Sequence, residues 1–333
     1  MREEKKSFEI KKIAAVVFIA TALLCVYFGF IRDGMESVKD KNATEKTQSS
    51  LEIQINTTSQ ETDMPTISEQ TRSVLSEEVT IPRVESTIAE TMIAVDNLEN
   101  LERLILNQMV YYAGDWSLYL TYLPTEMSIE INEQSMVAAS LIKLYIMACF
   151  FEQGEAGSAE LNPQTEKWMR EMISVSDNAA TNELVREMGQ GDTVYGREIV
   201  NAYCLQNDFS HTQQNRDLGI DSNLQNYTSV KNTGKLLESI YREACMTNRV
   251  DVHMMDLLKD QQRRNKIPMG IPEGVVVANK TGELANIEND AAIVFSPGGD
   301  YILCIMASGL GDTAKARAQI IELSDIVYTY FNP

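Results

Sequence analysis

The pattern of apolar and polar residues divides the chain into three stretches. Residues 13–31 form an uncharged apolar run of 19 residues, which at about 1.5 Å per residue can cross a bilayer core of about 30 Å. Residues 32–95 are rich in Ser, Thr, Glu and Gln and contain no aromatic residue, so they cannot bury enough apolar area to fold. From residue 96 onward, apolar residues recur at helix and strand spacings. The pattern predicts a cytoplasmic segment (1–12), a transmembrane anchor (13–31), a flexible stalk (32–95) and one folded domain (96–333).

The apolar run is preceded by a basic segment. Residues 1–12 contain Arg2, Lys5, Lys6, Lys11 and Lys12, and positive charge beside a membrane span favours the cytoplasmic side. A cleaved signal peptide is the alternative, but its apolar region is shorter and ends in small residues, whereas this run ends in Val-Tyr-Phe-Gly-Phe-Ile. We therefore expect a single-pass anchor in the cell membrane, with the folded domain outside the cytoplasm.

Within the folded domain, strand patterns at both ends enclose a helical middle. A helix is predicted from an N-cap at Asp96, with Leu98, Leu101, Ile105 and Met109 on one face. A β-hairpin is predicted over 116–131, and the other expected elements are helices over 139–153, 163–173, 179–188 and 229–246, strands over 275–279, 291–296 and 301–307, and a final helix capped by Asp312. One antiparallel sheet joining both ends predicts an α+β layered fold.

Charge and cysteine usage exclude several function classes. The chain has 29 basic and 48 acidic residues, a net charge of −19, whereas nucleic-acid binding needs a basic surface. The five cysteines include no Cys-x-x-Cys pair and no Cys/His cluster at metal-site spacing. We expect no nucleic-acid partner, metal or cofactor, and we expect Cys149 and Cys304, which stand in apolar runs, to pack as small hydrophobic residues.

Three short motifs carry the candidate chemistry. They are Ser140-Leu-Ile-Lys143, Ser176-Asp177-Asn178 and Lys280-Thr281-Gly282. An S-x-x-K is expected by chance about once in a chain of this length, and each tripeptide in about one chain in ten or fewer. All three in this order indicate a nucleophilic serine site.

Ser140 and Lys143 stand one turn apart at the start of a predicted helix, so their side chains share a face. The surrounding residues are apolar, and a desolvated lysine has a lowered proton affinity and can accept the serine proton. The helix N-terminus also favours developing negative charge. A surface lysine near a serine is the alternative for an isolated S-x-x-K, and the other two motifs argue against it.

The other two motifs also allow structural explanations. Ser176-Asp177-Asn178 precedes a predicted helix and is compatible with an ordinary N-cap. Lys280-Thr281-Gly282 follows the predicted strand 275–279, where a plain turn is the alternative, and its glycine would let a substrate approach the backbone.

With these motifs the chain resembles the penicillin-recognising serine hydrolases, and most closely the class A β-lactamase family. The resemblance covers about residues 96–333 and implies a five-stranded antiparallel sheet flanked by helices plus an all-helical lobe. It implies that Ser140 is the acylated nucleophile, Lys143 the base, Ser176 a proton relay, Asn178, Lys280, Thr281 and Gly282 substrate-binding residues, and the N–H groups of Ser140 and Glu283 the oxyanion hole.

The sequence departs from that family at the water-activating loop. The family carries a deacylating glutamate there, but no glutamate occurs between positions 198 and 238. Counting back from the predicted helix start places Gln213 or Gln214 near that position, with Asp217 and Asp221 close by. A neutral amide cannot take a proton from water at pH 7. His211, on the same loop, is an alternative base.

Other departures concern the lobe and the charge beside the site. The stretch between the first two motifs is short for the family, which implies a trimmed helical lobe. The predicted strand 291–296 has no arginine to pair a substrate carboxylate, and Glu283 adds negative charge beside Thr281, which predicts weak binding of an anionic β-lactam. His253 is expected on a helix face.

The resulting expectation is a membrane-anchored extracytoplasmic serine hydrolase that forms an acyl-enzyme at Ser140 with a β-lactam or a D-alanyl cell-wall amide. The alternative is a penicillin-binding sensor or slow DD-peptidase with a long-lived acyl-enzyme, because the deacylating glutamate is missing. Either activity needs no metal or cofactor, and the expected partners are the small-molecule or muropeptide substrate and the membrane.

Overall fold

The computed structural model describes residues 98–243 and 245–333. The predicted cytoplasmic segment, membrane anchor and stalk lie outside the described residues and stay predictions. Among the residues that are described, no helix combines the length and the apolar character that crossing a bilayer requires.

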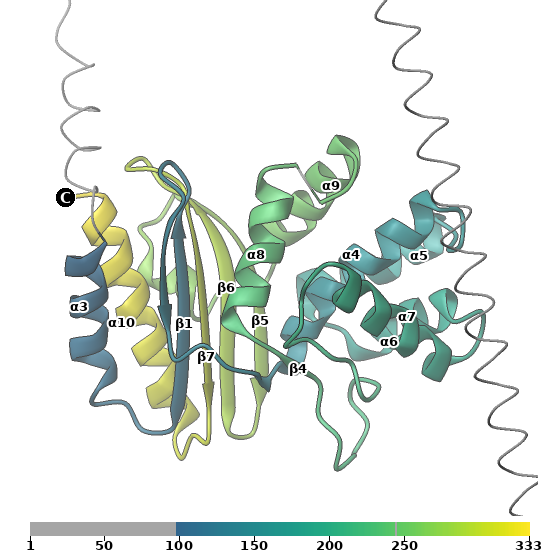
Figure 1. The fold of residues 1–333 in the computed structure, drawn as a ribbon, viewed down its shortest axis with the longest axis horizontal. Helices are drawn as coiled ribbons and strands as arrows, with labels where there is room; N and C mark the ends of the chain where they lie inside the picture. Colours follow the sequence, from purple (N-terminus) through teal and green to yellow (C-terminus); the bar gives the residue numbers. More distant parts are fainter. Residues whose placement is uncertain (1–97, 244) are drawn as a thin grey trace, which may run out of the picture. The chain divides into compact units, whose positions relative to one another are not determined.

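Five strands form one antiparallel sheet in the order β2-β1-β7-β6-β5 (Figure 1). They are β1 (Asp115–Tyr122), β2 (Met127–Ile131), β5 (Val276–Leu284), β6 (Ile287–Phe295) and β7 (Tyr301–Ser308). The N-terminal hairpin joins the C-terminal strands through β1 and β7, which pair from Asp115↔Ser308 to Tyr122↔Tyr301. The predicted α+β fold with a single antiparallel sheet is confirmed.

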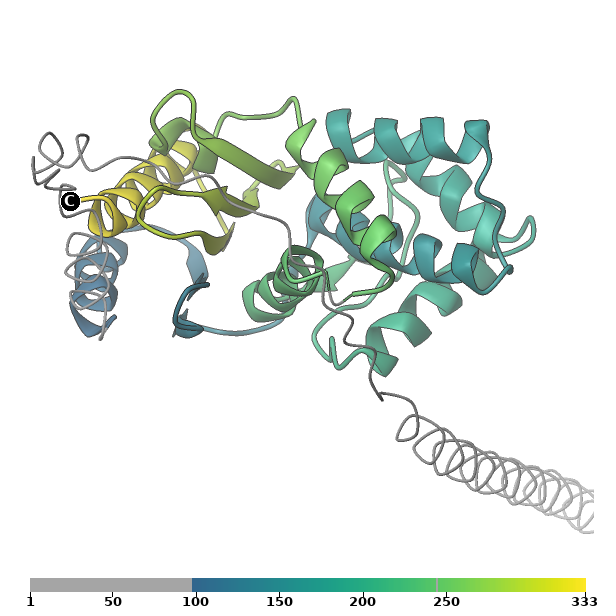
Figure 2. The same cartoon turned by 90° about the horizontal axis from the view of Figure 1, so that it is seen from above.

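One face of the sheet is covered by the first and last helices of the described domain, α3 (Glu99–Met109) and α10 (Thr313–Phe331) (Figures 1 and 2). The predicted apolar face of α3 is buried, but the helix begins at Glu99 with Leu98 as its N-cap, and Asp96 lies outside the described residues. Asp312 caps α10 as predicted, since its side chain accepts a hydrogen bond from the N–H of Lys315 at 3.0 Å.

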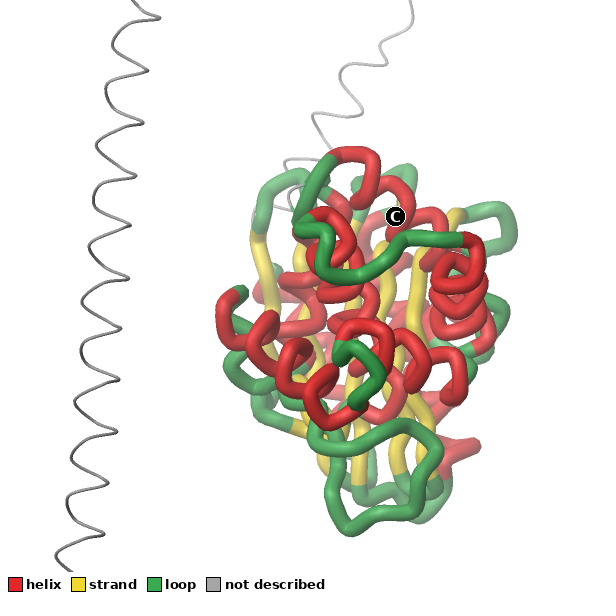
Figure 3. The backbone as a smooth tube through the Cα atoms, turned by 90° about the vertical axis from the view of Figure 1, so that its right-hand side faces the viewer, coloured by secondary structure: helices red, strands yellow, loops and turns green. Residues whose placement is uncertain are grey.

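The other face carries α8 and the helical lobe, which faces the viewer in Figure 3. Helix α8 packs against β1, β6 and β7. The elements on this side are β3 (Met136–Val137), η1 (Ala139–Leu141), α4 (Ile142–Glu155), α5 (Pro163–Arg170), the π-helical turn η2 (Glu171–Val175), α6 (Asn178–Met188), α7 (Thr193–Gln206), β4 (Tyr227–Thr228), α8 (Val230–Tyr241), α9 (Asn248–Lys259) and the 3₁₀ turn η3 (Ile267–Gly270). The short strands β3 and β4 pair with each other and tie the residues before Ser140 to the loop 207–226.

Three sequence predictions on this side were wrong. The helix predicted over 229–246 ends at Tyr241, because the backbone becomes left-handed at Glu243, with φ 53°, and turns into α9. Helix α7 was not expected, and α9 was expected only in so far as His253 was placed on a helix face. The Lys280-Thr281-Gly282 motif does not follow the end of the predicted strand 275–279 but lies inside β5, which pairs with β6 along its whole length.

The cysteines of the described domain are free thiols. Cys149 and Cys304 are fully buried among apolar residues, which confirms the prediction that they pack as small hydrophobic residues. Burial raises the pKa of both thiols, so neither is a reactive thiolate at neutral pH.

Candidate active site

Ser140 lies in η1, directly before the first turn of α4. It is half-buried, and its hydroxyl makes no hydrogen bond to any residue that the structure describes. The preceding residue, Ala139, has a left-handed backbone with φ 46°, a conformation that is strained for a residue with a side chain. Asn289 holds this turn from β6, because its Nδ2 donates to the carbonyls of Val137 at 3.0 Å and Ala138 at 3.2 Å. The serine is therefore presented on a strained turn that the sheet keeps in place.

Lys143 lies on α4, three residues after Ser140, and is completely buried. Its Nζ donates to the Ser176 carbonyl at 2.6 Å and to Asn178 Oδ1 at 2.8 Å, and lies 3.1 Å from Ser176 Oγ. Burial lowers the pKa of Lys143 to about 7, which the charge of Asp177 only partly offsets. A substantial share of the lysine is therefore a neutral amine at neutral pH and can accept a proton.

Lys280 reaches the same hydroxyl from β5. Its Nζ lies 2.9 Å from Ser176 Oγ and 2.8 Å from the Thr281 carbonyl. Burial lowers the pKa of Lys280 well below its usual value, and the neighbouring charge of Lys143 lowers it further. The Ser176 hydroxyl thus contacts two lysine amines, and the structure brings all three sequence motifs together.

Ser176 connects η2 to α6 in a left-handed conformation with φ 63°. The N-cap of α6 is its neighbour Asp177, whose Oδ1 accepts a hydrogen bond from the N–H of Ala180 at 2.7 Å. The capping role that the sequence allows for this motif therefore belongs to Asp177, and the Ser176 side chain is left to face the lysines.

The backbone of β5 lies against the nucleophile turn at Gly282. A Cβ atom at Gly282 would stand 2.9 Å from the Ala138 carbonyl oxygen and 3.2 Å from the Ser140 nitrogen, so a larger residue would push the strand away from Ser140. Because β5 is the edge strand of the sheet, every second N–H group along it points away from β6. This arrangement explains why a glycine stands inside a strand here.

A buried ionic cluster stabilises the end of the β5–β6 hairpin. Lys266 is fully buried, and its Nζ contacts Glu283 Oε1 at 3.0 Å, Glu288 Oε2 at 2.8 Å and the Gly282 carbonyl at 3.3 Å. Arg317 on α10 pairs with the second oxygen of Glu288 at 2.8 Å. The cations lower the pKa of Glu283 against the opposing effect of its burial. The negative charge predicted beside Thr281 is therefore present but compensated.

Arg263 is a charged residue at the site that the sequence did not reveal. It lies in the loop after α9, half-exposed, where its Nε donates to the Val175 carbonyl at 3.2 Å and its guanidinium is 3.6 Å from Glu283 Oε2. Its charge contributes to the lowered pKa of both Lys143 and Lys280. Arg263 thus places a guanidinium near Lys143 and Lys280, and no motif or predicted element marked it in the sequence.

The loop 207–226 reaches the site through Leu218 and Gly219. The backbone N–H and carbonyl of Leu218 pair with the side chain of Asn182 on α6 at 2.9 and 3.0 Å. A Cβ atom at Gly219 would lie 3.1 Å from Asn178 Nδ2. The loop residue against the Ser-Asp-Asn motif is therefore a glycine, and the side chain of its neighbour Leu218 is buried in the apolar core.

The loop residues proposed from the sequence are placed differently. Gln213 is exposed and its backbone pairs with Tyr227, while the backbone of the buried Gln214 pairs with the Asn201 side chain. Asp217, next to Leu218, forms an ion pair with Arg197 on α7. The assignment of Gln213 or Gln214 to the water-activating position stays a prediction.

The two histidines have separate partners. His211 is half-exposed and its Nδ1 lies 3.3 Å from Glu133 Oε1. His253 lies on α9, as expected for a helix-face residue, and pairs with Glu166 on α5 at 3.0 Å. Neither makes a described contact with the three motifs.

Comparisons with known proteins agree with the geometry. The model of the "Beta-lactamase enzyme family" matches residues 99–167 and 162–331. A solved structure of PBP-A is 23% identical, with a TM-score of 0.65 over 71% of this chain and 97% of that chain. The β-lactamase from Sphaerobacter thermophilus DSM 20745 is 17% identical, with a TM-score of 0.62 over 71% of this chain and 98% of that one.

An ancestral class A β-lactamase is 16% identical, with a TM-score of 0.61 over 68% of this chain and 98% of that chain. No curated protein matches the sequence. Because the family model spans most of the described residues and the three motifs meet at one serine, the chain belongs to the β-lactamase enzyme family and is a serine hydrolase, with a fold like that of the class A β-lactamases.

Proposed function

We propose that this protein is a membrane-anchored, extracytoplasmic hydrolase. A β-lactam or a D-alanyl cell-wall amide acylates Ser140, and the acyl group is then released slowly. The observation that carries the proposal is that Ser176 Oγ contacts both Lys143 Nζ and Lys280 Nζ. Of these two lysines, Lys143 stands one helical turn from Ser140. One PBP-A structure is described as an acyl-enzyme complex of a mutant with penicillin G, which supports β-lactams as acylating agents in this fold.

In the acylation step, neutral Lys143 accepts the proton of the Ser140 hydroxyl as Oγ attacks the carbonyl carbon of the amide. The new C–O bond forms and the carbonyl electron pair moves onto the oxygen. When this tetrahedral intermediate collapses, the C–N bond breaks. The departing nitrogen takes a proton from the Ser176 hydroxyl, which is replenished by Lys143.

Backbone and side-chain groups around Ser140 would bind the substrate. The N–H groups of Ser140 and Glu283 would stabilise the oxyanion, since Gly282 allows β5 to approach the nucleophile turn. Asn178 would hold the substrate amide. Lys280, Thr281 and the half-exposed Arg263 would bind the substrate carboxylate.

Deacylation would be the slow step. Water must lose a proton to attack the ester, and a positioned base contributes about 10²- to 10⁴-fold to such a step. The loop residue against Asn178 is Gly219, its neighbour Leu218 is held by Asn182, and Asp217 is paired with Arg197. We therefore favour a long-lived acyl-enzyme over fast β-lactam hydrolysis.

The slow release also suits a second function, a penicillin-binding sensor in which acylation itself is the signal. The absence of a loop glutamate favours this function equally.

The deciding experiment is intact-mass spectrometry during incubation with benzylpenicillin. We expect the protein to gain the mass of one penicillin within the acylation phase and to keep it for many times longer. Ser140→Ala should gain no mass, whereas the control Ser135→Ala, at an exposed serine outside the motifs, should behave as the wild type. Acylation of Ser140→Ala would show that Ser140 is not the nucleophile. Rapid return of the wild type to its unmodified mass would contradict slow release of the acyl group.

A further inference from the structure

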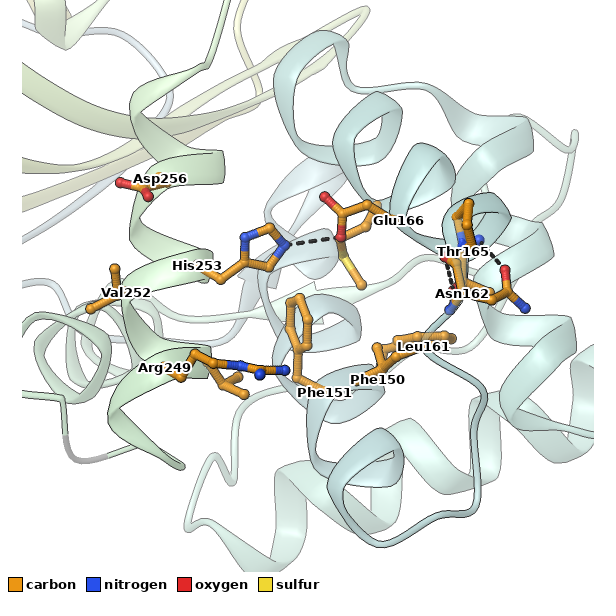
Figure 4. Close-up of a pocket in the computed structure, with 13 residues that line it drawn as sticks. Phe150, Phe151, Leu161, Asn162, Thr165, Glu166, Arg249, Val252, His253 and Asp256 are labelled. Carbon is orange, nitrogen blue, oxygen red and sulfur yellow. Dashed lines mark hydrogen bonds and ion pairs between the residues drawn. The ribbon is translucent and has the colours of Figure 1, made fainter.

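The helical lobe contains a groove that does not involve the three motifs. Helices α4, α5 and α9 enclose a cavity of about 730 Å³ (Figure 4), within the range of about 300–1,000 Å³ that holds small molecules in proteins. Its walls are mainly apolar and include Phe150 and Phe151 of α4, Leu161 of the connection to α5, Met169 of α5 and Val250 of α9. The connection between α4 and α5, residues 156–162, contributes Leu161 and Asn162 to the lining of the groove.

The charged side chains around the groove differ in whether an opposite charge pairs with them. Glu166 is paired with His253 at 3.0 Å and with Arg170 at 3.5 Å, and this His–Glu pair joins α9 to α5 (Figure 4). Asp256 lies 3.9 Å from Lys259. The side chain of Arg249 makes no ion pair or hydrogen bond with any residue in the described part of the chain.

Arg249 also has the orientation of a ligand-binding group. Figure 4 shows its guanidinium extending from α9 toward Phe151. The result is one uncompensated cation beside an apolar wall formed by two phenylalanines. A guanidinium recognises a carboxylate through charge-assisted hydrogen bonds, and the phenylalanines provide a surface for a hydrocarbon or aromatic group.

We propose that this groove binds an apolar monocarboxylate, with its carboxylate on Arg249 and its hydrocarbon part on Phe150, Phe151 and Met169. A neutral alcohol of the same length would lack the contact with Arg249 and bind more weakly. A dicarboxylate would place its second charge near Glu166 or Asp256 and bind more weakly as well.

The groove is also connected to Ser176, because α5 and α9, which form two of its walls, both contact η2. Helix α5 continues directly into η2, which ends at Ser176. From the α9 side, Gln261 Nε2 donates to the Ile173 carbonyl at 2.7 Å, and the N–H of Gln262 donates to the Ser174 carbonyl at 2.9 Å. A ligand that separates α5 from α9 would shift η2, and Ser176 with it, so occupancy should change the acylation rate of Ser140. This second consequence rests on the proposed function.

The test compares sodium octanoate with 1-octanol by isothermal titration calorimetry on the full chain. We expect octanoate to bind at least about tenfold more tightly than octanol, and Arg249→Gln to remove that difference, since a hydrogen bond to a charged group is worth about this much. Arg249 is exposed, so this variant should fold normally. Leu205→Ala, which changes an exposed apolar residue of α7, is the matched control and should bind as the wild type.

The outcomes separate the ligand site from the catalytic proposal. Equal binding of octanoate and octanol, or wild-type binding by Arg249→Gln, would overturn the carboxylate site whatever Ser140 does. In the second arm, octanoate should change the rate of covalent labelling by a fluorescent penicillin at least about twofold in the wild type but not in Arg249→Gln. Saturating octanoate with an unchanged rate would overturn the link to Ser176, and complete lack of labelling would instead contradict the proposed function.

Discussion

The two sides of the candidate site differ in the proton acceptors they present. On the side of α4, the buried Lys143 touches Ser176 and has its pKa lowered to about 7. On the opposite side, the loop 207–226 places Leu218 and Gly219 against α6. The first region is equipped to accept the proton of the nucleophile, whereas in the second the residue against Asn178 is Gly219, which has no side chain to accept a proton. The two halves of an acyl-transfer reaction can therefore be separated in one site, because each depends on its own proton acceptor.

The largest effect is expected from removing Lys143, the assigned proton acceptor on the α4 side. Lys143→Met should slow covalent labelling by a fluorescent penicillin by about 10²- to 10⁴-fold, because the base is lost while the apolar stem is kept. Stopped-flow labelling measures the effect, and Lys231→Met, at a surface lysine paired with Glu130, serves as the control. Near-wild-type labelling of Lys143→Met would mean that another group takes the serine proton.

A second effect is expected from adding a base on the loop side of the site. Leu218→Glu places a carboxylate on the loop segment held by Asn182, and we expect up to about 10²-fold faster deacylation with little change in acylation. The return of the acylated mass to the free mass measures the rate. Leu224→Glu, at an exposed position of the same loop, should leave it unchanged. No gain from Leu218→Glu would indicate that this segment does not face the ester.

A smaller effect is expected from pH. Lys143 must be neutral to accept a proton, and its pKa is lowered to about 7 by burial, so the neutral fraction is lost as the pH falls below that value. The acylation rate should drop about tenfold for each pH unit below about 7 and level off above it. Labelling rates between pH 5 and 9 provide the test. A flat profile would contradict a titrating amine.

The smallest effect is expected at Arg263. Its guanidinium is half-exposed and shared with Glu283, so Arg263→Gln should weaken the apparent affinity for a carboxylate-bearing penicillin by about fivefold, the size of a partly screened ionic contact. The penicillin methyl ester, which lacks that charge, should be unaffected. Arg103→Gln, at an exposed position on α3, is the control. Equal losses for acid and ester would show that Arg263 supports the fold instead.

The sequence predicted those parts of the structure that are determined by residues close together in the chain. Leu101 and Ile105 are buried on α3 as their helical spacing requires, and the hairpin of β1 and β2 follows from alternation around a turn. The motif residues could be found because their spacing is short. Arg263 and Leu218 could not, since each reaches the site through contacts with distant segments, at Val175 and at Asn182. Lys280 was expected beyond the end of a strand because its pairing with Ala291 is not visible in a local pattern.

The left-handed backbones at Ala139 and Ser176 have a consequence for engineering heat resistance. A stabilisation programme that relieves strained positions would replace such residues with glycine, which adopts φ values of 46° and 63° without steric penalty. Here Ala139 directly precedes the nucleophile, and Ser176 carries the hydroxyl that contacts both lysines. A more relaxed backbone would raise the melting temperature only by loosening the turn that aims Ser140 or by deleting the Ser176 hydroxyl. Substitutions that stabilise this domain should therefore be placed far from these two turns, for instance on the exposed faces of α3 and α7.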